Sequence, residues 1–309
     1  MSPDRPKGDY FCELLDFVMP WPDGTAAVLV AHVDASKRPG GTFCVAIVAC
    51  GADRAKKAVR RWVDLWGSTP CHMTDLHALR KDFRNWTSHQ AGEHLIRSVK
   101  LINRFASYAV AVSCDVADVE RLAPRRADAD SAVIHGGLAH SYALCCHMAM
   151  FALADLVRKT RQGAPDIAYF FERGDEHQGE SQRFISTAVA SPAGPPLYAC
   201  RSHVVMQASD ARLFEMADIF AWEWAKHIER VAVGRTKKRG SLRALLGGEG
   251  SDDLSFVSPS RHLFHMRGAA LKRFYARCES VGMFSDNPTP DQISTLEATA
   301  RRASLAYVP

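Results

Sequence analysis

The sequence predicts an α/β fold in which helices flank a mixed β-sheet. Three observations support this: a pair of β-rich apolar runs joined by a turn-rich link, later strand-like runs separated by helical segments, and acidic residues placed where strands end. Helices that alternate with strands pack against the faces of a sheet. The chain has 309 residues, 47% hydrophobic and 24% charged, which is enough to bury a large core.

The first ordered segment has the pattern of a β-hairpin. Two apolar runs, 26–33 and 42–49, are separated by the turn-rich segment 34–41, which contains a proline and two glycines. Such a link between two apolar runs is typical of antiparallel strands. Residues 1–24 carry prolines and glycines around one short apolar patch, so we expect an irregular lead-in there.

The central part of the chain alternates between helical and strand patterns. Apolar residues three and four apart, or long apolar stretches, predict helices over 52–66, 88–105, 133–159, 180–189 and 211–228. Short apolar runs predict strands over 108–114 and 167–171 and an extended segment at 203–207. The polar stretch 71–77 is expected to be a loop. A core domain at 25–232 accounts for these elements.

The C-terminal part is expected to be a basic linker and a helical extension, residues 233–309. It contains a basic segment at 234–243 and a glycine-rich acidic one at 247–253, followed by helical patterns near 263–281 and 290–305. We expect this extension to pack on the core domain rather than to form a second catalytic unit.

Composition excludes several classes of protein. No apolar run reaches the roughly 20 residues of a membrane span, and the N-terminus lacks a signal-peptide pattern, so we expect a cytoplasmic protein outside the membrane. Nine cysteines without regular spacing or a C-x-x-C pair predict reduced thiols and argue against structural zinc. The motifs of phosphate-binding loops, serine hydrolases and dinucleotide-binding folds are absent from the sequence.

Three acidic residues lie where an apolar core would not place them. Asp34 and Glu172 each follow a strand-like apolar run, and Asp218 lies in a helix that is apolar nearly all round. Carboxylates are rarely buried without a partner. Acids at the carboxyl ends of strands, joined by one from a packed helix, can converge at the sheet edge and hold Mg²⁺ or Mn²⁺. Such a site suits the hydrolysis of phosphodiesters.

Each acid also has a simpler interpretation. Asp34 can be a turn former, Glu172 can begin a polar loop in which Asp175 or Glu176 is the functional acid, and Asp218 can pair with Arg212 or Lys226. The interpretation as one site requires the three carboxylates to meet.

At these residues the sequence resembles the DUF3800 family, whose members are similar to ribonuclease H in fold. That family has a strand running into Asp-Glu-Ser-Gly, a long helix followed by a strand ending in an acid, and a helix with Gln-x-x-Asp. The corresponding stretches here are His-Val-Asp34-Ala-Ser-Lys, Ile-Ala-Tyr-Phe-Phe-Glu172 and Glu215-Met-Ala-Asp218. The resemblance spans about 26–228 and implies a ribonuclease-H-like sheet.

The chain departs from the family pattern at two positions. Ala35 replaces the usual Glu after the first Asp and removes a carboxylate, whereas Glu215 replaces Gln and keeps a polar oxygen on the same helical face as Asp218. The family often has a His in the region of 71–77, which makes His72 a candidate to orient substrate or move a proton. A loop histidine bonded to the backbone is the simpler interpretation of His72.

The leading hypothesis is a Mg²⁺- or Mn²⁺-dependent nuclease with Asp34, Glu172 and Asp218 as metal ligands and Glu215 and His72 as supporting groups. The alternative is a catalytically inactive scaffold that binds nucleic acid or a protein partner. A net charge of +5 and the basic segment 235–243 are compatible with nucleic acid, although such segments are more often solvated loops. His140, His147, Trp222 and Trp224 are expected to be packing residues.

Overall fold

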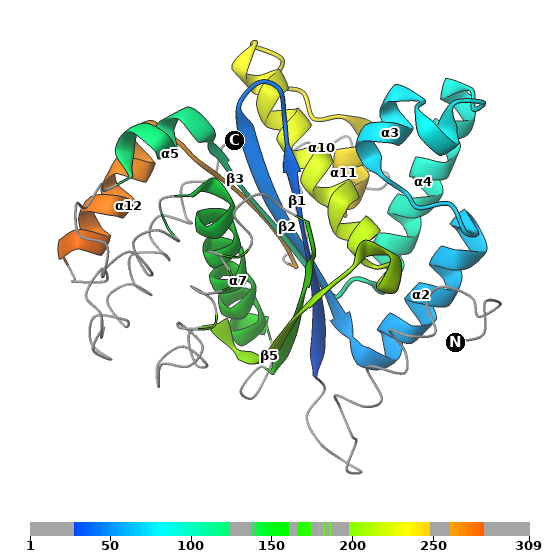
Figure 1. Ribbon diagram of the computed structural model, residues 1–309, viewed down its shortest axis with the longest axis horizontal. Helices are drawn as coiled ribbons and strands as arrows, with labels where there is room; N and C mark the ends of the chain where they lie inside the picture. The colour runs from blue at the N-terminus through cyan, green and yellow to red at the C-terminus, as the bar shows by residue number, and fades with distance from the viewer. Residues whose placement is uncertain are drawn as a thin grey trace.

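The computed structural model describes residues 28–123, 140–160, 166–174, 198–247 and 260–280, together with positions 138, 179, 182 and 186 (Figure 1). Sequence predictions for 1–24 and 290–305, and for nearly all of 180–189 and 247–253, lie outside these residues.

Six strands form one mixed sheet in the order β5-β4-β1-β2-β3-β6. The strands are β1 (Leu29–Lys37), β2 (Thr42–Gly51), β3 (Tyr108–Asp115), β4 (Ile167–Glu172), β5 (Cys200–Met206) and β6 (Arg261–Met266). β2 is antiparallel to β1 and β3, while β4, β5 and β6 are parallel to β1, β4 and β3 respectively. The predicted α/β fold with a mixed sheet is therefore confirmed.

Helices cover both faces of this sheet (Figure 1). On one face lies α7 (Ser141–Thr160), with α5 (Val116–Leu122) and α12 (Gly268–Ser280) near it. On the other face lies α10 (Phe214–Ala232), surrounded by α2 (Ala52–Trp66), α3 (Met73–Ala78), α4 (Ser88–Phe105) and α11 (Gly240–Leu245). Two short 3-10 helices, η1 (Lys81–Phe83) and η3 (Ala208–Asp210), complete the described elements.

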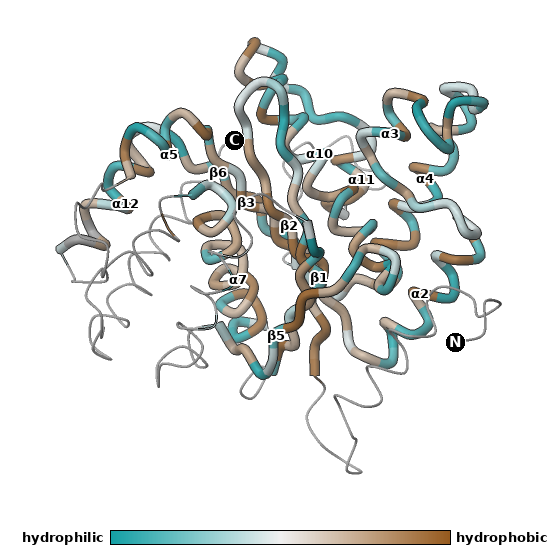
Figure 2. Tube along the Cα trace, in the orientation of Figure 1, coloured by the Kyte–Doolittle hydropathy of each residue, from teal (hydrophilic) through white to brown (hydrophobic). Residues whose placement is uncertain are grey.

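The alternation of side chains along β1 divides the core into two apolar layers. Leu29, Ala31 and Val33 pack in the layer under α7, whereas Val30 belongs to the layer under α10. Strands covered on both faces are apolar along nearly their whole length, which is why the hydropathy colouring shows them as the apolar centre of the molecule (Figure 2). No helix in the described part of the chain has both the length and the apolar character needed to cross a membrane.

Most predicted elements are present, with three corrections. Helices 52–66 and 88–105 match α2 and α4, and the hairpin and the strands at 108–114 and 167–171 are confirmed. The expected loop 71–77 contains α3. Asp34 lies inside β1 rather than after it, because the strand continues to Lys37.

The third correction concerns the C-terminal part. The helix expected from Leu263 begins at Gly268, and the residues before it form β6, which pairs with β3 at the sheet edge. Arg261 lies in this strand and is buried, and its guanidinium donates a hydrogen bond to the carbonyl of Ala106 at 3.1 Å. Long-range hydrogen bonds of this kind stabilise a strand that contains three polar residues among six.

Candidate carboxylate site

The pairing of β1 with β4 brings two of the predicted acids together. Their parallel register ends with the pair Val33 and Phe171, so Asp34 and Glu172 are the next residues on adjacent strands. Val33 and Phe171 face α7, and successive side chains alternate between the faces, so both acids project toward α10. The two carboxyl groups are hydrogen-bonded to each other.

The third acid reaches the same place from α10. Asp218 lies in the second turn of this helix and is buried, as is Asp34. Burial raises the pKa of Glu172, and the negative charge of Asp218 raises it further, while the contacts with Asp34 and His72 act in the opposite direction. Since the three carboxylates interact in a partly buried space, their mutual repulsion favours a bound proton or cation.

The segment before α3 supplies two donors to Asp218. Its Oδ2 accepts a hydrogen bond from the backbone N–H of Met73 at 2.8 Å and lies 3.4 Å from Nδ1 of His72. The imidazole of His72 is largely exposed, with 62% of its side chain accessible. The hydrogen bond to Asp218 and the charges of Asp218, Glu172 and Asp75 outweigh burial and raise the pKa of His72 to about 9. His72 is therefore a cation beside the acids at neutral pH.

Glu215 lies one turn before Asp218, and its carboxylate binds groups of the α2–α3 connection. Its Oε2 accepts hydrogen bonds from Trp62 Nε1 at 2.7 Å and from the backbone N–H of Cys71 at 2.9 Å. Burial raises the pKa of Glu215, whereas Arg212, Trp62 and Cys71 lower it. These contacts place Glu215 as a group that holds the segment carrying His72.

Arg212 completes this attachment. Its guanidinium pairs with Glu215 and donates to the carbonyls of Gly67 at 3.1 Å and Thr69 at 2.7 Å. Together with Glu215 and Asp218, it binds the connection between α2 and α3 to the start of α10. This role was not predicted from the sequence, although Arg212 and Glu215 are three residues apart, a spacing at which side chains on one helical turn can pair.

The alternative partners considered for Asp218 pair elsewhere. Arg212 binds Glu215, and Lys226 lies 3.4 Å from a carboxylate oxygen of Glu229. The other alternative acids, Asp175 and Glu176, lie outside the described residues.

The donor chemistry of the three carboxylates suits a hard divalent cation, because such ions prefer oxygen ligands. The hydrogen-bonded pair of Asp34 and Glu172 beside the charge of Asp218 is the observation that fits such an ion. As the side chains stand, no group of three or more His, Cys, Asp or Glu residues in the described part of the chain has the spacing of a metal site.

Ala35 lies on the opposite side of the sheet from the acids. It packs against the apolar layer under α7, whereas Asp34 faces α10. A glutamate at this position would extend toward α7. The departure from the family pattern at Ala35 thus leaves the group formed by Asp34, Glu172 and Asp218 unchanged.

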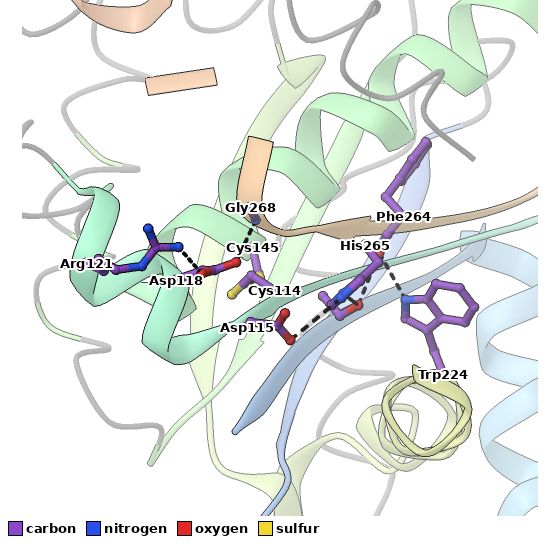
Figure 3. Close-up of polar contacts among 10 residues, drawn as sticks. Cys114, Asp115, Asp118, Arg121, Cys145, Trp224, Phe264, His265 and Gly268 are labelled. Atoms are coloured by element: carbon purple, nitrogen blue, oxygen red, sulfur yellow. Dashed lines mark hydrogen bonds and ion pairs between the residues drawn. The ribbon is translucent and has the colours of Figure 1, made fainter. Parts of the chain in front are cut away.

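A second polar group lies near the other end of α10 (Figure 3). Ser113 Oγ is 3.0 Å from Nδ1 of His265, and Nε2 of His265 is 3.7 Å from Asp115. Asp115 and His265 line a cavity of about 310 Å³ beside the last residues of α10. Ser113 is fully buried, so its hydroxyl is not available as a nucleophile. This group was not predicted from the sequence, because the pattern near 263–281 indicated a helix that includes His265, whereas His265 lies in β6.

The packing roles expected for the tryptophans and for His147 are confirmed. Trp222 and Trp224 are buried, and the indole N–H of Trp224 donates to the carbonyl of Phe264 at 3.0 Å (Figure 3). His147 is buried in the layer under α7 and is hydrogen-bonded to the hydroxyl of Tyr198.

Comparisons with known proteins give only distant matches. No protein family model matches the chain, and no curated protein matches it. Among solved structures, the chain is similar to ribonuclease H2 from Pyrococcus horikoshii OT3, with 11% identity, a TM-score of 0.37 and coverage of 89% of this chain and 99% of that one. It is also similar to a chain in the PCNA:RNase HII complex from Archaeoglobus fulgidus, with 14% identity, a TM-score of 0.36 and coverage of 74% and 85%.

Proposed function

We propose that this protein is a divalent-metal-dependent nuclease, or a related enzyme that cleaves phosphodiesters. The observation that carries the proposal is the convergence of Asp34 from β1, Glu172 from β4 and Asp218 from α10 on one side of the sheet. Three carboxylates that repel one another are stabilised when a cation binds between them. Glu172 ends β4, and Asp34 follows the last residue of β1 that pairs with β4, which supports a ligand site here because α/β proteins commonly bind ligands at the carboxyl ends of parallel strands.

Asp34, Glu172 and Asp218 would hold Mg²⁺ or Mn²⁺. The bound ion would polarise a phosphoryl oxygen and lower the pKa of a water molecule. The imidazolium of His72, largely exposed beside Asp218, would bind a phosphate oxygen of the substrate or donate a proton to the leaving oxygen. Glu215 and Arg212 would act as positioning residues, because they fix the segment that carries His72.

The catalytically inactive scaffold remains the competing function. Its main support is the missing carboxylate at Ala35, and the orientation of this residue toward α7 weakens that support. A scaffold would bind nucleic acid or protein without cleavage, so the assay below separates the two functions.

The test is cleavage of end-labelled single-stranded and duplex DNA and RNA by the full chain in Mn²⁺, in Mg²⁺ and in excess chelator. We expect metal-dependent cleavage, lowered at least about 100-fold by Asp34→Asn or Asp218→Asn because a ligand of the ion is lost. Asp64→Asn is the matched control, since Asp64 is an exposed aspartate on α2.

If both site variants cleave at the wild-type rate, the cleavage activity comes from a contaminating nuclease and not from this site. Binding without cleavage of any of these substrates in either metal would favour the scaffold.

A further inference from the structure

Four basic side chains from separate parts of the sequence gather around Trp222 on α10. The guanidinium carbons of Arg38 and Arg239 lie 5.2 Å and 5.1 Å from the centre of the Trp222 ring, and the ring of His77 lies 4.8 Å from it. Lys226 is one turn further along α10. Burial lowers the pKa of His77, and the positive charges of Arg239, Lys226 and Arg38 lower it further. We call Arg38, Lys226 and Arg239 the cationic surface.

Carboxylates hold these cations in place without cancelling their charge. Arg38 and Lys226 lie 3.3 Å and 3.4 Å from Glu229, and Arg239 lies 3.3 Å from Glu223, which is fully buried. Three cations thus share two carboxylates. Both arginines make these ion pairs through Nε, and the terminal NH₂ groups of a guanidinium carry its other N–H donors, which suit bidentate binding of a phosphate.

The cationic surface lies directly beside the carboxylate site. Trp222 is four residues and Lys226 eight residues beyond Asp218 on α10, or about 6 Å and 12 Å along the helix axis. Nucleic acid carries one phosphate per strand for about each 3.4 Å of duplex, so 12 Å corresponds to roughly three to four nucleotides. A strand whose reacting phosphate lies at Asp218 would therefore have neighbouring phosphates within reach of Arg239 and Lys226.

A nuclease site made of three acids needs nearby cations such as these to bind a polyanionic substrate. The three acids at the carboxylate site repel a polyanion, so a nucleic-acid strand needs compensating cations close by to approach them. Trp222 is only 1% exposed, so its ring supports the two guanidiniums by cation–π contact and is not a platform for base stacking. Contact with phosphates rather than with bases is the mode of binding that this chemistry supports.

We infer that the cationic surface binds the phosphate backbone of the substrate strand on one side of the scissile bond, through Arg38, Lys226 and Arg239. This inference rests on the proposed nuclease function. It assigns the affinity of the protein for nucleic acid to residues other than the three acids. Because the contacts are with phosphates, it predicts binding with little dependence on base sequence.

The experiment measures binding of a fluorescent single-stranded oligonucleotide by anisotropy in excess chelator, over a range of salt concentrations. Lys226→Gln is expected to weaken binding several-fold and to reduce the slope of log K against log salt by about 0.7 to 1, since one phosphate contact is lost. Lys57→Gln, at an exposed lysine on α2, is the matched control and should leave both quantities unchanged.

A second variant separates lost contact from lost net charge or lost folding. The double variant Arg239→Gln/Glu223→Gln removes the guanidinium together with its buried partner, so the net charge of the protein is preserved. We expect weaker binding in this variant with a far-ultraviolet circular dichroism spectrum like that of the wild type. Wild-type affinity and salt slope in both Lys226→Gln and the double variant, or no binding by the wild type, would overturn the inference.

The outcome for the cationic surface is distinguishable from that for the nuclease function. Asp34→Asn and Asp218→Asn should keep or increase oligonucleotide affinity, because they remove negative charge. Cleavage by the wild type together with unchanged binding in the surface variants would reject the surface and keep the nuclease. Weakened binding in the surface variants without cleavage by the wild type would keep the surface and reject the nuclease.

Discussion

Arg212 and Glu215 form a buried ion pair on which the position of His72 depends. Both side chains are almost fully buried, and their remaining contacts are with Trp62 and with the backbone of the connection between α2 and α3. Removal of one partner leaves the other charge buried without compensation, whereas removal of both avoids this cost. The pair should therefore show strong energetic coupling.

A double-mutant cycle tests this coupling. Arg212→Met alone is expected to lower the free energy of unfolding by about 3–5 kcal/mol, and Arg212→Met/Glu215→Met by less than the sum of the two single changes. Arg61→Met, which breaks the exposed pair of Arg61 with Asp64, should cost less than about 1 kcal/mol. Denaturant unfolding measures these three variants together with Glu215→Met, and strictly additive effects of the two single changes at Arg212 and Glu215 would contradict a coupled pair.

His32 is a second residue whose environment predicts a measurable effect. It is buried in β1 on the α10 side, with its ring stacked on Phe170 at 5.4 Å and edge-on to Phe214. Burial lowers the pKa of His32 to about 3, from 6.5. The folded state thus keeps this imidazole neutral at pH values where the unfolded state binds a proton.

Stability should therefore decrease on acidification. The contribution of neutral His32 is fully present above pH 6.5 and is lost progressively as the pH falls toward 3, by up to about 1.4 kcal/mol per pH unit. His32→Gln should reduce this slope between pH 6.5 and 5, as measured by denaturant unfolding at each pH. His89→Gln, at an exposed position on α4, should leave the slope unchanged. An equal slope in His32→Gln would refute the assignment.

At the scale of elements, the alternation of side chains along β1 determines which residues belong to the carboxylate site. Its even-numbered residues His32, Asp34 and Ser36 face α10, and its odd-numbered residues face α7. This alternation determines the effect of having Ala35 where the DUF3800 pattern has Glu. A carboxylate at that position would enter the apolar layer under α7 instead of joining Asp34.

Ala35→Glu is therefore expected to lower the free energy of unfolding by about 1–3 kcal/mol, because it places a carboxylate against an apolar layer. It should add nothing to the affinity for Mn²⁺, which calorimetry measures. Lys37→Glu, at an exposed position of the same strand, should leave stability nearly unchanged. A gain in metal affinity in Ala35→Glu would show that this side chain reaches the acids after all.

The elements that the sequence predicted well are those with a local signal. α2 and α4 have one apolar face each, and α4 also begins with a capping box formed by Thr87 and Gln90, so their limits could be predicted from local patterns. β6 and α3 have no such signal, since β6 depends on pairing with β3, and α3 begins where Asp218 accepts a hydrogen bond from Met73 N–H.

The same division applies to the candidate site. Asp34, Glu172 and Asp218 were identifiable because an acid in an apolar strand or helix needs a partner. The hydrogen bonds of Arg212 to Gly67 and Thr69, the neighbours of His265, and the gathering of cations around Trp222 depend on contacts between residues more than a hundred positions apart or on different elements. A single sequence carries no local signal for these contacts.

At the scale of the whole molecule, opposite charges lie side by side on the α10 face of the sheet. A net charge of +5 says little by itself, but the local arrangement places the three acids next to three cations, with Asp218 and Lys226 both on α10. This arrangement is consistent with a substrate that is anionic along its length and reacts at a metal ion. The mixed sheet fixes the positions of the carboxylate site and the cationic surface, because α10 packs on β1 and β2 and carries Asp218 of the former and Lys226 of the latter.

The measurement that tests the central claim most directly is calorimetric titration of Mn²⁺ into the metal-free full chain. We predict that the wild type binds the ion, that Asp34→Asn and Asp218→Asn each weaken binding at least about 100-fold, or about 2.7 kcal/mol, and that Asp64→Asn binds like the wild type. Binding that is unaffected by both site substitutions, or no binding by the wild type, would contradict a shared metal site formed by Asp34, Glu172 and Asp218.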